Sequence, residues 1–476
     1  MAGMSPGQGV RQLFCTPKML ILQLLCLSFV LFRIFFVFLH FNCIISLCNI
    51  AMNIKLRLII MNFLEFAVWG AYLTSMGGYL AQVGLVGKIW LFFAVQGIVS
   101  IFMPAVMGIV ADKWIQAQKV LSLCHGIAGL LMVAAGVYAM MNAEALQFGP
   151  FFALYTISVA FFMPTIAIAN SVAYTGLDKA GLDSVKHFPP IRVFGTIGFI
   201  CCMLAVNFIK NGQGVQFQHS HEQFLLSGAL SLVLSVYALT LTPCPCLGKE
   251  RPSRSFAEVS GLSAFRLFKE PKFAIFFLFS MFLGASLQIT NGYANTFITH
   301  FQSVPEFANT WGAHNANALI SLSQLSETLC ILLIPFCLRK FGIKKVMLIS
   351  MVAWVLRFGL FGVGDTGSGV WMLILSCIVY GVAFDFFNIS GSLYVEYATS
   401  DDIRSSAQGL FMLMTNGLGA TLGTWAAGKV VDHYVVYAAE PNWSMAWYVF
   451  AGYALLVAVL FAICFKDEKF PVTNKR

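Results

Sequence analysis

The chain has 476 residues, of which 59% are hydrophobic and only 10% are charged, and its mean hydropathy is +0.81. A soluble domain carries about 25% charged residues to cover its surface, so this composition excludes a soluble protein and indicates one embedded in a bilayer. The net charge of +9 comes without a dense Lys/Arg block, which argues against nucleic-acid binding, and the 13 Cys include no paired Cys-x-x-Cys motif for a metal.

A membrane-spanning helix needs about 20 mostly apolar residues. After residue 56 we expect such helices at 57–82, 87–111, 119–141, 148–175, 189–209, 222–243, 273–299, 315–338, 344–364, 370–396, 405–428 and 444–465. The sequence therefore predicts an all-α membrane protein with twelve transmembrane helices.

The polar segment 244–272 divides the chain into two parts of similar length, 52–243 and 273–466, each with six predicted helices, and a tail follows at 467–476. Two six-helix halves joined by a central loop are typical of secondary transporters built from parallel repeats. After the second helix the chain reads Gly108-Ile-Val-Ala-Asp112-Lys113, which resembles the loop signature of the major facilitator superfamily.

The positive charges in the connections predict the orientation of the chain. Only Lys88, Lys210 and Lys429 lie on the side reached after odd-numbered helices, and the other Lys and Arg of the connections lie on the opposite side. Since Lys and Arg accumulate in cytoplasmic loops, we expect the central loop and both ends of the twelve-helix core in the cytoplasm.

Residues 1–51 do not fit this scheme. Their apolar stretch, broken by Arg33, would add a thirteenth span. That span would place the N-terminus outside and spoil the pairing of the two six-helix halves. Charges follow Met52 directly before the first predicted helix, as expected at a natural start. We therefore expect 1–51 to be an over-extended start or a dispensable extension, which N-terminal sequencing of the native protein would test.

Five charged residues stand out away from the ends of the predicted helices, near the bilayer centre, where a charge costs roughly 2.5–3.5 kcal/mol on insertion scales and is a functional candidate by default. They are Glu65, Arg192, Glu327, Arg357 and Asp385. Asp385 stands among aromatic residues, where packing does not require a charge. Arg357 has no polar neighbours at helical spacing, which favours snorkelling or a structural pair over a ligand role.

Four predicted helices also carry polar or aromatic side chains at helical spacing. These are Arg192, Thr196 and Phe199; Gln288 and Asn291; Gln324 and Glu327; and Tyr380 and Phe384. Such faces avoid lipid, so we expect them to meet in a shared cavity between the halves. Each amide alone has a second interpretation as a bridge between neighbouring helices.

The residue types in these faces indicate the ligand. Side-chain amides present a donor and an acceptor together, as the edge of a nucleobase or a sugar requires, and aromatic rings suit a flat face. Burial raises the pKa of a carboxyl group and a nearby Arg lowers it, so a carboxylate that alternates between these settings carries protons. Asp385 and Glu327 are the predicted carriers, with Arg192 as a partner.

Four strings carry a family resemblance. They are Phe188-Pro-Pro-Ile-Arg-Val-Phe-Gly-Thr-Ile-Gly-Phe199, Leu287-Gln-Ile-Thr-Asn291, Ser323-Gln-Leu-Ser-Glu327-Thr and Tyr380-Gly-Val-Ala-Phe-Asp-Phe-Phe-Asn-Ile-Ser-Gly391. From Met52 to about Lys466 the chain resembles the bacterial nucleoside:proton symporters of the major facilitator superfamily. The resemblance implies nucleoside contacts at Arg192, Thr196, Phe199, Gln288, Asn291, Gln324, Glu327, Tyr380 and Phe384, and proton coupling at Asp385.

The resemblance implies proton-driven nucleoside uptake by alternating access across a bacterial inner membrane. We expect a transporter and not an enzyme, without cofactor or metal, that works as a monomer; a sugar or drug carrier of the same fold is the alternative. Glu65 matches no family acid, which leaves a second proton site or a changed pH dependence open. His219, His221 and Glu222 are expected in a solvated external connection and not at a metal.

Overall fold

The structure is a computed structural model that describes residues 53–143, 145–246, 262–400 and 403–466. The extension 1–51, the tail 467–476 and residues 247–261 of the central loop lie outside this description. The described residues are helical, apart from turns and an isolated bridge between Lys210 and Gln216.

Two groups of helices follow one another along the chain. The first contains α2 (Ile54–Gly70), α3 (Met76–Gln82), η1 (Val86–Lys88), α4 (Ile89–Lys113), α5 (Ala117–Met141), α6 (Phe148–Phe162), α7 (Thr165–Lys179), α8 (Ser184–Phe208), η2 (Phe217–His219) and α9 (Glu222–Ala238). The second contains η3 (Leu262–Lys269), α11 (Pro271–His300), η4 (Phe301–Ser303), α12 (Trp311–His314), α13 (Ala316–Val363), α14 (Val370–Ala398), α15 (Arg404–Met412), η5 (Leu413–Gly419), α16 (Ala420–Val431), η6 (Asp432–Val436) and α17 (Trp443–Cys464). We call these the N-terminal and C-terminal groups.

Within the described residues, eight helices are long and apolar enough to cross a membrane. They correspond to nine of the predicted spans, because α13 contains both 315–338 and 344–364. The other three predicted spans are short or interrupted: 57–82 is divided into α2 and α3, α9 has 17 residues, and 405–428 passes through the π-helical turn η5. The all-α prediction is confirmed for the described residues, and the number of twelve spans stays a prediction.

Local chemistry explains how the helices differ in detail from the predicted spans. Pro164 cannot donate a backbone hydrogen bond and separates α6 from α7, although 148–175 was expected to be continuous. Gly342 has a φ of 77° and bends α13 at the expected turn between two spans. Pro189 and Pro190 lie inside α8, which begins at Ser184 and not at the prolines.

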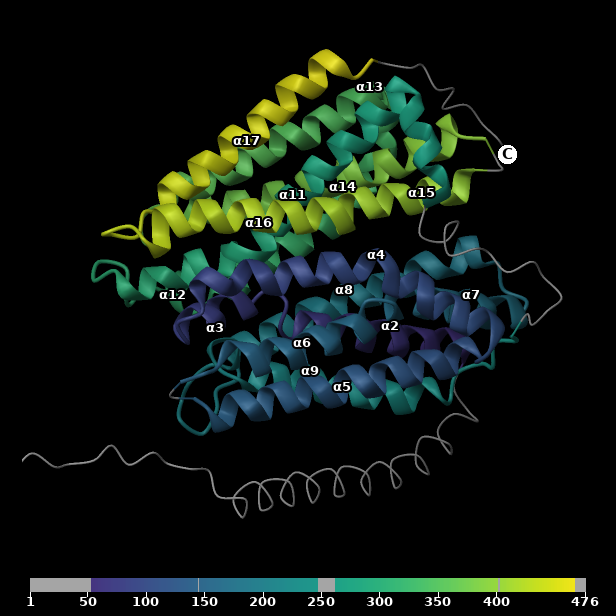
Figure 1. Ribbon diagram of the computed structural model, residues 1–476, viewed down its shortest axis with the longest axis horizontal. Coiled ribbons are helices and arrows are strands. Elements are labelled where there is room, and N and C mark those ends of the chain that lie inside the picture. Colours follow the sequence, from purple (N-terminus) through teal and green to yellow (C-terminus); the bar gives the residue numbers. More distant parts are fainter. Residues whose placement is uncertain (1–52, 144, 247–261, 401–402, 467–476) are drawn as a thin grey trace, which may run out of the picture. The chain divides into compact units, whose positions relative to one another are not determined.

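The two groups meet along a few helices (Figure 1). α4 packs against η5 and α16, α8 packs against α13, and α3 packs against α11. Inside the groups, α9 packs against both α2 and α5, and α14 and α17 pack against α13. These helices form the main contacts between the groups.

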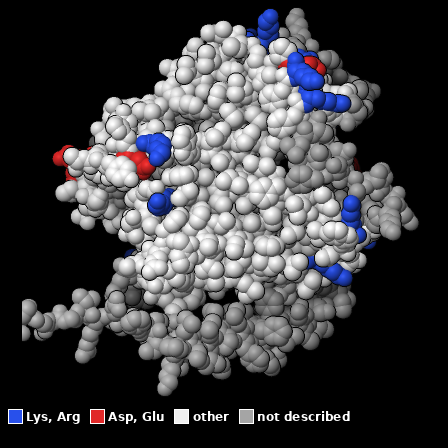
Figure 2. Space-filling model, in the orientation of Figure 1, with Lys and Arg blue, Asp and Glu red and all other residues white. Residues whose placement is uncertain are grey.

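Charged side chains gather near the ends of the helices, with an almost uncharged band between them (Figure 2). Large apolar side chains such as Leu332, Ile463 and Leu356 are more than half exposed on this chain. An apolar surface of this kind requires lipid around it, since water would not solvate it.

Gly198 on α8 allows a close approach to α2. A Cβ atom at this position would collide with the backbone carbonyl of Phe63, and backbone does not move aside as a flexible side chain does. At Gly359 of α13, by contrast, a Cβ atom would meet nothing within 4 Å.

We predict that Gly198→Ala separates α8 from α2 and destabilises the protein by about 1–3 kcal/mol, the usual cost of overpacking. The matched change Gly359→Ala should leave stability equal or slightly higher, since Ala favours a helix interior over Gly by about 0.5–1 kcal/mol. Thermal unfolding of both purified variants measures the difference, and equal unfolding temperatures would contradict the packing described here.

Candidate functional site

A cavity of about 640 Å³ lies between the N-terminal and C-terminal groups. Its N-terminal side is lined by Trp69, Gln96, Gly97, Ser100, Ile101, Pro104, Ala105, Gly108, Ala111, Ala117, Met163, Ile166, Ala167, Ile168, Asn170 and Ser171. Its C-terminal side is lined by Leu287, Gln288, Asn291, Phe384, Gly409, Met412, Leu413 and Asn416. Amides and hydroxyls among apolar walls are the composition expected of a site for a small polar ligand.

Much of this cavity comes from α4 and α7, which sequence reasoning did not select. On α4 the residues Gln96, Ser100, Pro104 and Gly108 follow one another at a spacing of four and form one small or polar face. That spacing was visible in the sequence. It was missed because glycine, alanine and proline on a helix face suggest close packing as readily as a cavity.

Three of the predicted residues, Gln288, Asn291 and Phe384, line the cavity. The Oε1 atom of Gln288 is buried and has no hydrogen-bond partner in the described structure. An unpartnered buried acceptor costs free energy, so Gln288 is placed to accept a hydrogen bond from a ligand.

Two further predicted residues, Gln324 and Tyr380, line a small polar cavity that shares Asn291 with the large one. The rings of Tyr380 and Phe384 are stacked, with centroids 5.9 Å apart and an interplanar angle of 13°. Together they extend an aromatic surface from the small cavity to the large one, against which a planar group can lie.

The remaining predicted contacts do not line either cavity. Phe199 packs edge-on against Trp69, which lines the cavity, with ring centroids 6.4 Å apart. The guanidinium of Arg192 lies 3.8 Å from the centre of the Phe66 ring, and the charges of Arg192 and Glu327 act on each other across the two groups. The linings of the two cavities include none of Phe199, Arg192, Glu327 and Thr196.

Asp385 follows Phe384 on α14 and lies on another side of that helix. It is only 3% exposed, and its Oδ2 atom has no hydrogen-bond partner in the described structure. The charges of Asp385 and Glu327 also act on each other. Because a buried, unpartnered carboxylate is costly, binding of a proton at Asp385 would remove most of that cost.

Arg357 is fully buried and does not reach the lipid surface, so snorkelling is wrong for this residue. Its Nη1 atom donates to the carbonyl oxygen of Ser376 at 2.7 Å, and its guanidinium lies 4.6 Å from the centre of the Tyr380 ring. It also lines the small polar cavity. Arg357 therefore packs against the ring of Tyr380 at the small polar cavity.

The large cavity extends to the helix ends on one side, and hydrogen bonds join the two groups on the other side. Gly108, Ala111 and Ala117, which line it, border the connection predicted to be cytoplasmic. At the opposite end, hydrogen bonds join the two groups: Asn207 Nδ2 donates to Asn315 Oδ1 at 2.8 Å, and Gln218 Nε2 donates to the carbonyl oxygen of His314 at 3.1 Å. The structure is thus closed on the predicted external side.

His219 belongs to this closed end. Its ring nitrogens lie 3.1 Å from Gln82 Nε2 and 3.4 Å from Gln302 Nε2, so it touches side chains of both groups. Burial, with a smaller contribution from nearby His314, lowers the pKa of His219 to about 4. No group of three His, Cys, Asp or Glu that could hold a metal ion occurs in the described part of the chain.

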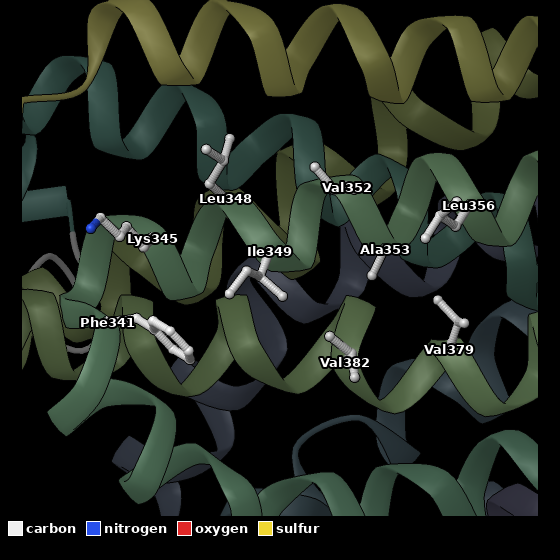
Figure 3. Close-up of a pocket in the computed structure, with 9 residues that line it drawn as sticks. All are labelled: Phe341, Lys345, Leu348, Ile349, Val352, Ala353, Leu356, Val379 and Val382. Carbon is white, nitrogen blue, oxygen red and sulfur yellow. The ribbon is translucent and has the colours of Figure 1, made fainter.

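A second, apolar groove of about 520 Å³ lies along α13 and α14 (Figure 3). Val352 and Leu356 of this groove are 46% and 53% exposed, and Lys345 is its one charged lining residue. It offers no amide or hydroxyl side chain to a polar ligand, so the cavity between the groups is the candidate substrate site and the groove faces lipid.

The comparisons with known proteins decide the family. The model of the family described as nucleoside H+ symporter matches residues 52–469, nearly the whole chain. The chain belongs to the nucleoside H+ symporter family. Its members are transporters and not enzymes, so the transporter fold, the cavity between two helix groups and the family agree.

Individual relatives support the same assignment. The xanthosine permease of Escherichia coli (strain K12) is 46% identical over 430 residues, which cover 88% of this chain and 98% of the permease. The crystal structure of nucleoside transporter NupG matches this transporter with a TM-score of 0.78 at 44% identity, covering 88% of this chain and 100% of NupG. A crystal structure of a POT family peptide transporter, 12% identical, shares the fold alone, with a TM-score of 0.63 over 89% of this chain and 99% of the other.

We predict that the closed end depends on pH through His219. Its pKa is about 4 when buried and about 6.5 when solvated, so the closed state is fully favoured above about pH 6.5 and is progressively lost as the pH falls toward 4. Spin labels at Gln213→Cys and Glu306→Cys, in a cysteine-free background, should move apart between about pH 7 and about pH 5.

In His219→Gln, which keeps a hydrogen-bonding side chain without this titration, the label distance should be the same at both pH values. An unchanged pH response in that variant would contradict the role of His219.

Proposed function

We propose that this transporter imports nucleosides together with protons across a bacterial cytoplasmic membrane by alternating access. The observation that carries the proposal is the cavity between the two helix groups, which is closed at one end by hydrogen bonds and lined by amides and an aromatic ring. A cavity that opens to one side at a time is what alternating access requires.

The proposed substrate contacts follow from the lining. Gln288 and Asn291, with Gln324 beside them, offer paired donors and acceptors for the edge of a base, and the Phe384 ring offers a face for stacking. Arg192 and Glu327 do not line the cavity in this conformation, in which the predicted external end is closed. We propose that they, with Thr196, Phe199 and Tyr380, contact the nucleoside when the groups rearrange around it.

The proposed coupling residues are Asp385 and Glu327. Their charges act on each other and Arg192 acts on Glu327, so a proton on one carboxylate changes the electrostatic field at the other residues. Because Arg192 belongs to the N-terminal group and both acids to the C-terminal group, protonation alters the attraction between groups. That is how a proton can favour one conformation over the other.

We further propose that both ends of the helical core lie in the cytoplasm and that one chain is sufficient. Both helix groups that enclose the cavity belong to one chain, so one chain supplies both halves that alternating access needs. Transport would draw on the proton gradient without a cofactor.

We predict that cells lacking their own nucleoside carriers accumulate labelled uridine when they express this chain, and that a protonophore abolishes the accumulation. One proton entering at 100 mV contributes about 2.3 kcal/mol, or about fiftyfold accumulation. Asp385→Asn should abolish accumulation while it preserves exchange of external for internal uridine, because exchange needs no net proton movement.

Asp178→Asn, the same chemical change at an exposed helix end, is the matched control and should transport normally. Equal loss of accumulation and exchange in Asp385→Asn would argue against coupling at this residue. If the cells take up a labelled sugar and no uridine, the cavity is the site of a sugar carrier, which is the alternative function.

A further inference from the structure

A buried acid–base pair lies inside the N-terminal group, away from the proposed coupling residues. Glu65 of α2 and His125 of α5 are both 0% exposed, and Oε2 of Glu65 lies 2.8 Å from Nε2 of His125. α9 packs against both helices (Figure 1) and carries Ser231, whose Oγ lies 2.9 Å from His125 Nδ1. The hydroxyl of Thr165, at the start of α7, lies 2.6 Å from Oε1 of Glu65 and 2.6 Å from the carbonyl oxygen of Phe162, and its one proton can be donated to either.

The hydrogen bonds around this pair define how many protons it holds. The hydroxyl oxygen of Ser231 lies 2.9 Å from the carbonyl oxygen of His125 and 2.9 Å from its Nδ1. In the arrangement in which Ser231 donates its single proton to the carbonyl oxygen, its oxygen accepts from Nδ1. One proton then lies between Nε2 and Oε2. Whether it resides on the imidazole or on the carboxyl group, every one of these contacts remains a hydrogen bond and the pair stays neutral.

Removal of that proton changes the energy of the site. The lone pair of His125 Nε2 would face a carboxylate oxygen at 2.8 Å, and the pair would carry a net negative charge among buried helices. Such a charge is costly unless a positive charge is near it. The site therefore holds one proton and releases it only when a cation compensates.

The groups that act on Glu65 can be named for each helix around it. α5 contributes His125 and Cys124, and α8 contributes Arg192, whose charge and that of Glu65 act on each other. α7 and α9 contribute the hydroxyls of Thr165 and Ser231. Arg192 is thus the compensating cation.

Arg192 also responds to Glu327 of the C-terminal group, and no carboxylate among the described residues forms a direct ion pair with it. Its charge is therefore shared between an acid of each group. When a proton neutralises Glu327, the pull on Arg192 toward the C-terminal group weakens and Glu65 becomes its remaining acidic partner.

We infer that Glu65 and His125 form a second proton-binding site, whose proton is released when Arg192 turns from Glu327 toward Glu65. This inference rests on the proposed proton-coupled uptake and adds one proton to each transport cycle. Glu65 lies one helical turn before Trp69, which lines the cavity, so the released proton has a short distance to water that enters there.

The test is the number of protons moved per uridine, measured in proteoliposomes with the purified full chain as the gradient at which net uptake reverses. In Glu65→Gln, which keeps the side-chain shape, the ratio should be one lower than in the wild-type protein. At a gradient of one pH unit this lowers maximal uridine accumulation about tenfold. Exchange of uridine, which needs no net proton movement, should persist.

The chain offers a matched control in Glu222→Gln, since Glu222 forms a partly exposed pair with His221 at 3.7 Å in the same helix group. This variant should keep the wild-type ratio. An unchanged ratio in a folded Glu65→Gln would overturn the inference and leave the pair a structural one.

A second variant, His125→Gln, removes the imidazole and should also lower the ratio by one. If neither variant folds, the wild-type ratio decides: three protons per uridine, one more than Asp385 and Glu327 can carry, support the second site, and two or fewer overturn it. A wild-type protein that moves uridine without protons would instead refute the proposed function itself.

Discussion

A charged or amide group inside a bilayer has no water to bind, so it must find its partner within the protein. This constraint organises the structure. The guanidinium of Arg357 is paired with a carbonyl oxygen and an aromatic ring, and Gln96 donates to the hydroxyl of Tyr155 at 2.7 Å. Several buried polar atoms of the described residues still lack a partner, Nη2 of Arg357 among them. Two of these atoms, Gln288 Oε1 and Asp385 Oδ2, lie on helices proposed to handle the substrate and the proton.

The same constraint explains how two groups of helices can move against each other. Asn207 and Gln218 join the closed end through two hydrogen bonds each to the C-terminal group, and each bond contributes about 0.5–1.5 kcal/mol. Such bonds can be exchanged for bonds to water when that end opens. The buried acids and Arg192 cannot be solvated so easily, and their charge state therefore decides which arrangement is favoured.

Much of this organisation follows from the sequence because charges are rare in apolar helices. Glu65, Arg357 and Asp385 stand out in the sequence, and the structure buries all three. The partner of Glu65 did not stand out, because His125 is distant in sequence and a single histidine has no periodic pattern. The role of α4 was hidden for the opposite reason, since its small residues resemble ordinary helix packing.

Neighbours in sequence can also have separate environments. Phe384 lines the cavity and Asp385 does not, because successive residues of a helix point about 100° apart. The strings that carry the family resemblance contain both kinds of residue without distinguishing them. The break at Pro164 follows from a proline that the sequence shows, whereas the π-helical turn η5 has no such local signal.

The central claim is that the cavity between the two helix groups is the nucleoside site. Calorimetric titration of the purified protein with uridine tests it most directly. We expect Gln288→Ala to weaken uridine binding about five- to tenfold, the effect of one lost hydrogen bond, and Gln213→Ala on the exposed connection to leave it unchanged. Equal affinities for the wild-type protein and Gln288→Ala would contradict the account.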